Sequence, residues 1–351
     1  MTASTPKAKL NLALQGGGAH GAFTWGVLDR LLQSDRFRFD TVSATSAGAV
    51  NAAALASGLA TGGPAAARAK LREVWDAIVD AVPPDLNPML ASLGKLQAFG
   101  APSMAQIAGL VSPYTFNPFD FNPLRELLET RIDFAAIRSK GKLGLLIAAT
   151  DASTGRARLF RHTELTVDMV LASACLPMLY KAVTIEGQNY WDGGFSANPD
   201  LVTLAREAKA KDTLIVLLNP TSRDAVPTHS VDILSQINRI TFSQPLLRDV
   251  REILSIREAL AGPQSVLVGA ERKKVAHHRF HLIEAGAYTG KLSETSKGRP
   301  DRATVDGLFQ AGKREAEGWI ARHAREVGQR ETVNLAMRLL PDSGPMNAQK
   351  G

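Results

Sequence analysis

A run of glycines directly after a short apolar segment constrains the fold of this chain more than any other feature. The segment Leu10–Gln15 is followed by Gly16-Gly17-Gly18-Ala19-His20-Gly21, and apolar residues then recur at helical spacing up to Leu32. This order predicts a buried strand, a tight turn and a helix. Backbone amides in such a turn, at the start of a helix, can approach and bind a negative charge.

A second strand and helix follow at once and indicate the fold class. Residues Asp40–Thr45 are predicted as a strand, and Ala47–Ala56 as an alanine-rich helix. Two parallel strands need a crossover between them, so strand, helix, strand and helix in this order predict a βαβ unit. We therefore expect an α/β protein of three layers with a mostly parallel central sheet.

Patterning also places later elements. Further strands are expected at 142–149, 181–185, 213–219 and 279–283, with a turn through 186–188. A helical pattern covers 230–261 and is expected to break near Pro245, and a last helical stretch covers about 304–340. Residues 83–121, rich in proline, glycine and apolar side chains, are expected to form an irregular cap or insertion near the site entrance.

The glycine run also fits a dinucleotide-binding fingerprint, because Gly16 to Gly21 matches G-x-G-x-x-G between a strand and a helix. That fingerprint needs an acidic residue at the end of the second strand. Asp40 begins that strand instead, and Thr45-Ser46 ends it. A phosphate-binding P-loop is also disfavoured, because no Lys-Ser or Lys-Thr pair follows the glycines.

Ser46 lies where the second strand turns into a helix, in the run Ala44-Thr45-Ser46-Ala47-Gly48. A nucleophilic serine on a sharp turn needs small residues two positions to either side, which Ala44 and Gly48 provide. The start of the helix also supplies a partial positive field that favours a serine alkoxide. From this run alone, a serine that only caps the helix is an equal alternative.

Asp192 is followed by Gly193 and Gly194, and this run has two interpretations. Asp-Gly is a strong turn signal by itself. Alternatively, Tyr190 and Trp191 exclude water from Asp192 and raise the pKa of its carboxyl, which suits a base that deprotonates a serine.

Together the three runs resemble the patatin-like phospholipase family. The resemblance extends through Ser173-Ala174-Cys175-Leu176-Pro177, Val183–Gly187 and Asn198, and covers roughly Leu10 to Asp200. It implies a three-layer patatin-like fold with a domain at 8–290, including the cap at about 83–121. A helical C-terminal extension is expected at 291–340 and a frayed tail at 341–351.

The resemblance also implies the roles of individual residues. Ser46 is similar to the family's nucleophile and Asp192 to its base, and neither a metal nor a cofactor is expected. The oxyanion hole is expected at Gly16, Gly17, Gly18 and Ala47, with motif support from His20, Gly21, Gly48, Gly193 and Gly194. The chain departs from the family at Ala44, which replaces a glycine, and at His20, where the family often has arginine or lysine.

The implied activity is acyl ester hydrolysis through an acyl-enzyme intermediate, of phospholipase A or lysophospholipase type. Alternatives are a general esterase, an intracellular polyester hydrolase, a catalytically silent storage or scaffold protein, and a nucleotide-binding oxidoreductase. A Ser-Asp-His triad would need His277, His278 or His281. These histidines lie in a basic run that we interpret as a surface segment leading into a strand.

Bulk composition leaves the partners open. The chain has 351 residues and a formal net charge of +7, which is compatible with nucleic acid, with an anionic membrane surface, or with neither. Residues Arg272–His281 with the apolar cap could provide membrane contact, and a solvated charge run is the competing interpretation. We expect a lipid or acyl ester substrate and no nucleic acid partner. Cys175 is the only cysteine and residues 1–10 have no secretory pattern, so a cytoplasmic location is predicted, with peripheral membrane contact as an option.

Overall fold

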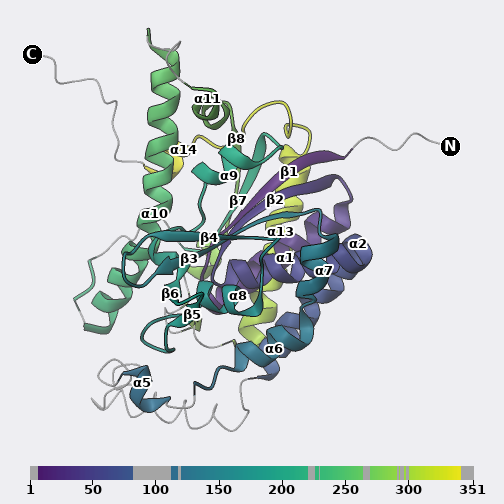
Figure 1. Ribbon diagram of the computed structural model, residues 1–351. Coiled ribbons are helices and arrows are strands. Elements are labelled where there is room, and N and C mark those ends of the chain that lie inside the picture. The colour runs from purple at the N-terminus through teal and green to yellow at the C-terminus, as the bar shows by residue number, and fades with distance from the viewer. Residues whose placement is uncertain are drawn as a thin grey trace, which may run out of the picture.

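A mostly parallel sheet forms the middle layer of the protein, with helices on both faces (Figure 1). The computed structural model describes residues 7–81, 112–117, 120–219, 226–228, 230–263, 269–290, 292, 296–297 and 300–340. Most of the expected cap at 83–121, and the expected tail at 341–351, lie outside the described residues. The three-layer α/β class predicted from the sequence is confirmed.

The described sheet has eight strands hydrogen-bonded in the path β5-β6-β3-β2-β1-β7-β8, and β4 also pairs with β3. The parallel strands are β1 (Ala8–Leu14), β2 (Phe37–Thr45), β3 (Gly144–Asp151), β7 (Asp212–Leu217) and β8 (Arg279–Glu284). The antiparallel strands are β4 (Ala157–Arg161), β5 (Val183–Ile185) and β6 (Gln188–Asp192). The carboxyl ends of β1 and β2 therefore meet at one edge of the sheet.

Each face of the sheet has its own apolar core, because side chains alternate along the strands. Leu12 and Leu14 of β1 pack in the core beneath α1 (Gly21–Ser34), α2 (Ala47–Asp80) and α13 (Arg302–His323). Ala13 packs in the opposite core with α9 (Val202–Glu207), α10 (Ser230–Ala261) and α14 (Leu335–Leu339).

Shorter elements complete the described structure. The helices are α5 (Pro113–Phe116), α6 (Pro123–Arg131), α7 (Phe134–Lys140), α8 (Val167–Ser173), α11 (Ala270–Ala276) and α12 (Gly286–Thr289). The 3-10 turns are η1 (Gly18–His20) and η2 (Gly193–Phe195). No helix among the described ranges is long and apolar enough to pass through a bilayer.

The C-terminal helix α13 packs directly on α1 through two glycines. A Cβ placed on Gly26 would lie 2.0 Å from the Phe309 carbonyl oxygen, and one on Gly312 would lie 2.0 Å from that of Phe23. The ring centroids of Trp25 and Phe309 are 4.0 Å apart beside this crossing. A Cβ at either glycine would force the two helices apart. With both glycines present, the buried side chains of α13 pack in the same core as those of α1.

Several element boundaries differ from the sequence expectation. Helix α2 continues past Ala56 to Asp80, with non-helical backbone only at Gly62 and Gly63. Helix α10 contains Pro245 without the expected break. The expected helix at 304–340 is two helices, α13 and α14, and β4 was not anticipated.

Candidate active site

Ser46 lies at the turn between β2 and α2, as the sequence predicted, and its backbone is strained. Its φ and ψ are 55° and −124°, in a region that non-glycine residues seldom occupy. Ser46 precedes the first turn of a long helix, so the partial positive charge of the α2 N-terminus lies next to its hydroxyl. This geometry exceeds what a helix-capping serine requires, since the Ser46 side chain makes no capping hydrogen bond.

Small residues allow three backbone segments to approach closely at this turn. A Cβ on Gly16 would lie 2.8 Å from the Ser46 Cβ, and one on Gly48 would lie 2.4 Å from the Leu14 carbonyl oxygen. A Cβ on Gly21 would lie 2.8 Å from that of Ala47. The glycines at these positions are therefore required by packing of the turn against β1 and α1.

Ala44, which replaces the glycine common in the family, sits inside the ladder of β2. It is fully buried and pairs with Leu14 on one side and Ile147 on the other. Its φ is not positive, and Ser46 still adopts the strained turn. The extra methyl group is therefore accommodated in the core.

Asp192 reaches Ser46 because β6 continues the line of β2. Thr45, the last residue of β2, pairs with Ala148, and Asp192, the last residue of β6, pairs with Ala149. Strand β4 occupies the other edge of β3 over the same residues, so β6 lies on the same edge as β2. The chain leaves β2 at Ser46, and Asp192 arrives beside it from the opposite direction.

The Asp192 carboxylate is completely buried. Its Oδ1 accepts the Gly194 N–H at 2.7 Å. No donor within the described residues meets the distance and angle criteria for a hydrogen bond to Oδ2. Burial raises the pKa of Asp192 to about 7, against the opposing effects of the Gly194 N–H and the Ser46 hydroxyl. The sequence attributed this raised pKa to Tyr190 and Trp191; in the structure Gly194 also packs closely against the carboxylate, since a Cβ placed on it would lie 3.0 Å from Asp192 Oδ1.

The glycine turn offers backbone donors beside Ser46, but not all of those expected. The Gly16 N–H donates to Asn198 Oδ1 at 2.8 Å, so its expected role as an oxyanion donor is wrong. The N–H groups of Gly17, Gly18 and Ala47 have no acceptor within the described part of the chain. Gly18 has a φ of 57°, which favours glycine at that position.

His20 is buried behind the turn. Its Nε2 lies 2.7 Å from Ser296 Oγ, and the backbone of the next residue, Lys297, covers Gly18 closely enough that a Cβ there would lie 2.3 Å from the Lys297 carbonyl oxygen. His20 therefore joins the glycine turn to a segment far away in the sequence, and does so with an imidazole where the family often has a permanent cation.

Neither buried histidine of the basic run reaches the candidate dyad. His278 Nε2 lies 2.7 Å from Thr213 Oγ1, and burial lowers the pKa of His278 to about 4. His281 contacts Thr332 and Asp212. The surface interpretation is correct for His277 and wrong for His278 and His281, which are buried directly before β8 and within it, against β7. Within the described residues, a Ser-Asp-His triad is not formed.

Three supporting residues received no role from the sequence. Ser173 Oγ accepts the Ser46 N–H at 3.0 Å, and Asn198 Nδ2 donates to the Phe242 carbonyl at 3.0 Å. The Phe242 ring packs where a Cβ on Gly194 would stand, 2.2 Å away. Ser173 and Asn198 lie in runs that carry the family resemblance, whereas no sequence signal marks Phe242.

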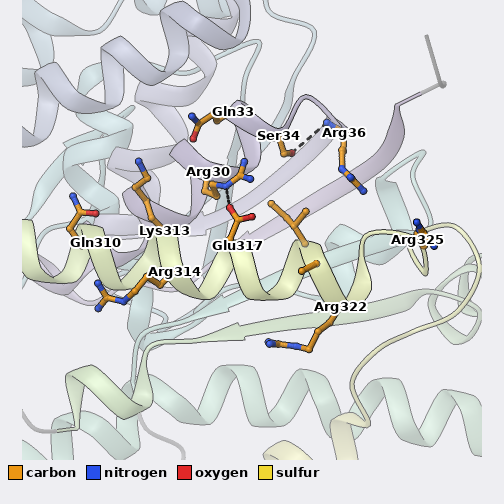
Figure 2. Close-up of a pocket in the computed structure, with 12 residues that line it drawn as sticks. Arg30, Gln33, Ser34, Arg36, Gln310, Lys313, Arg314, Glu317, Arg322 and Arg325 are labelled. Atoms are coloured by element: carbon orange, nitrogen blue, oxygen red, sulfur yellow. Dashed lines mark hydrogen bonds and ion pairs between the residues drawn. The ribbon is translucent and has the colours of Figure 1, made fainter. Parts of the chain in front are cut away.

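A groove of about 1200 Å³ lies elsewhere, at the end of α1 and along α13 (Figure 2). Its lining residues Ser34 and Arg36 precede β2, so the groove is at the opposite end of this strand from Ser46. The groove is basic, but Arg314 and Arg322 extend from the side of α13 away from Arg30 (Figure 2). Its cations therefore do not converge on one point.

Comparison with known proteins supplies the family. The family model described as patatin-like phospholipase matches residues 12–205, more than half of the chain. Among solved structures, the crystal structure of VipD from Legionella pneumophila aligns with 89% of this chain and 68% of that chain, at 14% identity and a TM-score of 0.35. No match is found among curated proteins. With Ser46 and Asp192 both inside the span that the family model matches, the chain belongs to the patatin-like phospholipase family.

Proposed function

We propose that this chain is a serine-dependent lipid acyl hydrolase in which Ser46 is the nucleophile and Asp192 the base. Membership of the family supports lipid acyl hydrolysis in general. The observation that supports the dyad best is the buried Asp192 carboxylate beside a strained Ser46, with a pKa of about 7. A base with a pKa near the working pH combines availability with the driving force for proton transfer.

The first half of the reaction forms an acyl-enzyme. Asp192 accepts the hydroxyl proton of Ser46 while Ser46 Oγ attacks the carbonyl carbon of the ester. The N–H groups of Gly17, Gly18 and Ala47 are the proposed donors to the resulting oxyanion. Asp192 then gives its proton to the departing alcohol, and the C–O bond of the ester breaks.

The second half releases the fatty acid. Asp192 takes a proton from water as the water attacks the acyl carbonyl, the same donors hold the second oxyanion, and Ser46 leaves with the proton returned by Asp192. Backbone donors are suited to both steps, because they are already oriented and need not reorganise as charge develops.

We further propose that the substrates are phospholipids or lysophospholipids, with other acyl esters as the alternative. The test combines labelling by a fluorophosphonate with hydrolysis of phosphatidylcholine, lysophosphatidylcholine and a p-nitrophenyl ester. We expect an adduct on Ser46 and release of fatty acid from at least one lipid. Turnover of only the p-nitrophenyl ester would favour a general esterase, and the lack of any Ser46 adduct would favour a silent scaffold.

A further inference from the structure

Exposed apolar side chains are concentrated near the candidate dyad. Ten large hydrophobic residues are exposed in the described part of the chain, and eight of them lie on three segments that connect to the Asp192 region, either directly or through a neighbouring segment. We call these eight the apolar rim: Tyr114, Phe121, Leu176, Met178, Leu179, Ile233, Ile237 and Ile240. Clustering of this kind on a water-facing surface indicates a contact site for another apolar surface.

The first segment is the loop between α8 and β5, which holds Leu176, Met178 and Leu179. The loop begins at Cys175, whose carbonyl oxygen accepts the Asp192 N–H at 2.8 Å. It is closed at the other end by the Cys175 thiol, which donates to the Lys181 carbonyl oxygen at 3.0 Å. The loop is thus fastened directly to the backbone of the proposed base.

The second segment is α5 with its C-terminal turn. Tyr114 Oη accepts the Ala182 N–H at 3.3 Å, and Lys181 Nζ lies 5.8 Å from the centre of the Tyr114 ring. Phe121 is held by Asn117, which both donates to its carbonyl oxygen and accepts its N–H. These bonds place α5 against the loop that reaches Asp192.

The third segment is the first half of α10. Ile233, Ile237 and Ile240 recur at helical spacing and are exposed by 41%, 51% and 48%. Two residues after Ile240, Phe242 packs on Gly194, and its ring centroid lies 4.8 Å from that of Phe195. The exposed isoleucines therefore lie on the same helix as the phenylalanine that packs on Gly194, next to Asp192.

The charge distribution favours a bilayer contacted through apolar side chains. The lysines and arginines of α11 precede β8, and the basic groove precedes β2, so both lie at the opposite end of the parallel strands from Ser46. A membrane held by those cations would face away from the dyad. At the dyad end, Lys181 stacked on Tyr114 is the kind of amphipathic pair that anchors at a lipid–water interface.

We propose that the apolar rim docks the protein on the surface of a phospholipid bilayer and so presents the Ser46 end to the lipids. The purpose of this docking rests on the proposed lipid hydrolase activity. The test of docking is independent of that activity, because it measures vesicle binding alone. Binding is measured by flotation with phosphatidylcholine vesicles, using Ser46→Ala protein so that no lipid is cleaved. Because the contact is apolar, we expect binding to uncharged vesicles that persists in about 0.5 M salt, where the Debye length falls to about 4 Å.

The test variant carries both Ile237→Ser and Ile240→Ser, and the matched control carries Met337→Ser. Met337 is 76% exposed on α14, outside the rim. We expect the double rim variant to bind vesicles about tenfold more weakly or worse, and Met337→Ser to bind as the parent does. Circular dichroism and melting curves verify that each variant is folded.

Two results would overturn the proposal. One is equal vesicle binding by the rim variant and its parent. The other is a dimer in light scattering that the rim variant converts to monomer, since the rim would then be covered by a second copy of the chain. A third result separates the two proposals. If the rim variant binds vesicles more weakly than its parent, but the protein with Ser46 intact hydrolyses no ester, the proposed enzyme activity is contradicted and the docking surface is supported.

Discussion

Gly16 donates its amide hydrogen to Asn198 Oδ1 at 2.8 Å, which ties the glycine turn to the segment following Asp192. The same asparagine donates to the Phe242 carbonyl oxygen, so one buried side chain joins β1, the dyad segment and α10. Asn198 does not contact the proposed reacting atoms. It is a positioning residue, because it holds the turn that contains Gly17 and Gly18.

We therefore expect Asn198→Ala to slow ester hydrolysis by about 10- to 100-fold, mainly in kcat, because small misplacement of catalytic donors is costly. The measurement is kcat and KM on a soluble p-nitrophenyl ester. Asn11→Ala is the matched control, since Asn11 is a fully buried asparagine on β1 that bonds to Ala210 and Thr213, away from the site. Equal loss of kcat in both variants would show that Asn198 acts through the stability of the fold and does not position the catalytic donors.

The pH dependence of the reaction follows from the pKa of Asp192, which burial raises to about 7. The base must be ionised to accept the Ser46 proton, so kcat/KM should rise as pH increases through about 7 and level off above it. Rates on an uncharged ester between about pH 5 and 9 provide the test. A profile that is flat across this range would show that Asp192 is not the base whose ionisation controls the rate.

Stability should change with pH in the opposite sense. The pKa of Asp192 is higher in the folded state than its ordinary value of 3.8. The contribution of Asp192 to the free energy of unfolding is therefore fully present below pH 3.8 and is lost as the pH rises towards 7. We expect Asp192→Asn to be more stable than the parent at about pH 8, by up to about 4 kcal/mol, and much less so at about pH 5. Denaturant unfolding at both pH values measures this, with Ser46→Ala, which keeps the carboxyl, as the control. An unchanged difference between the two pH values would contradict it.

The crossing of α1 and α13 gives a prediction about the C-terminal region. Gly312→Ala should destabilise the protein by about 1–3 kcal/mol, because its Cβ would lie 2.0 Å from the Phe23 carbonyl oxygen. Gly307 is on the same helix, and a Cβ placed there would have nothing within 4 Å, so Gly307→Ala should stabilise by about 0.5–1 kcal/mol. Melting curves for the two variants would need to shift in opposite directions. A single transition in both would place α13 and the rest of the fold in one cooperative unit.

The sequence predicted the parts of the fold and site that depend on local geometry. The turns at Gly18 and Ser46 need small neighbours, and each follows a strand whose last residues are buried, so both were visible in the residues. Strand β4 was missed because Ala157–Arg161 is short, contains two arginines and shows no alternation of polar and apolar residues, and only Phe160 is buried. At Gly62-Gly63-Pro64, turn residues only kink α2, since packing of Leu71 and Trp75 in the core holds its second half.

Residues whose role depends on a distant partner could not be assigned from the sequence. The Gly16 amide was expected to hold an oxyanion, and only the folded chain brings Asn198 to it. His278 and His281 follow three basic residues and resembled a surface run, yet the neighbouring strand β7 buries them. Local pattern specifies a turn or a strand, whereas the acceptor of a given N–H is set by tertiary packing.

The central claim is that Asp192 activates Ser46, and the most direct test is the pre-steady-state acylation of the enzyme by a p-nitrophenyl ester at about pH 8. The burst of p-nitrophenol gives the acylation rate, and mass spectrometry of the quenched protein locates the acyl group. We predict a burst with the acyl group on Ser46, none in Ser46→Ala, and acylation slower by about 10³-fold or more in Asp192→Asn. Acylation of Asp192→Asn at the parent rate, or an acyl group on another residue, would contradict the account.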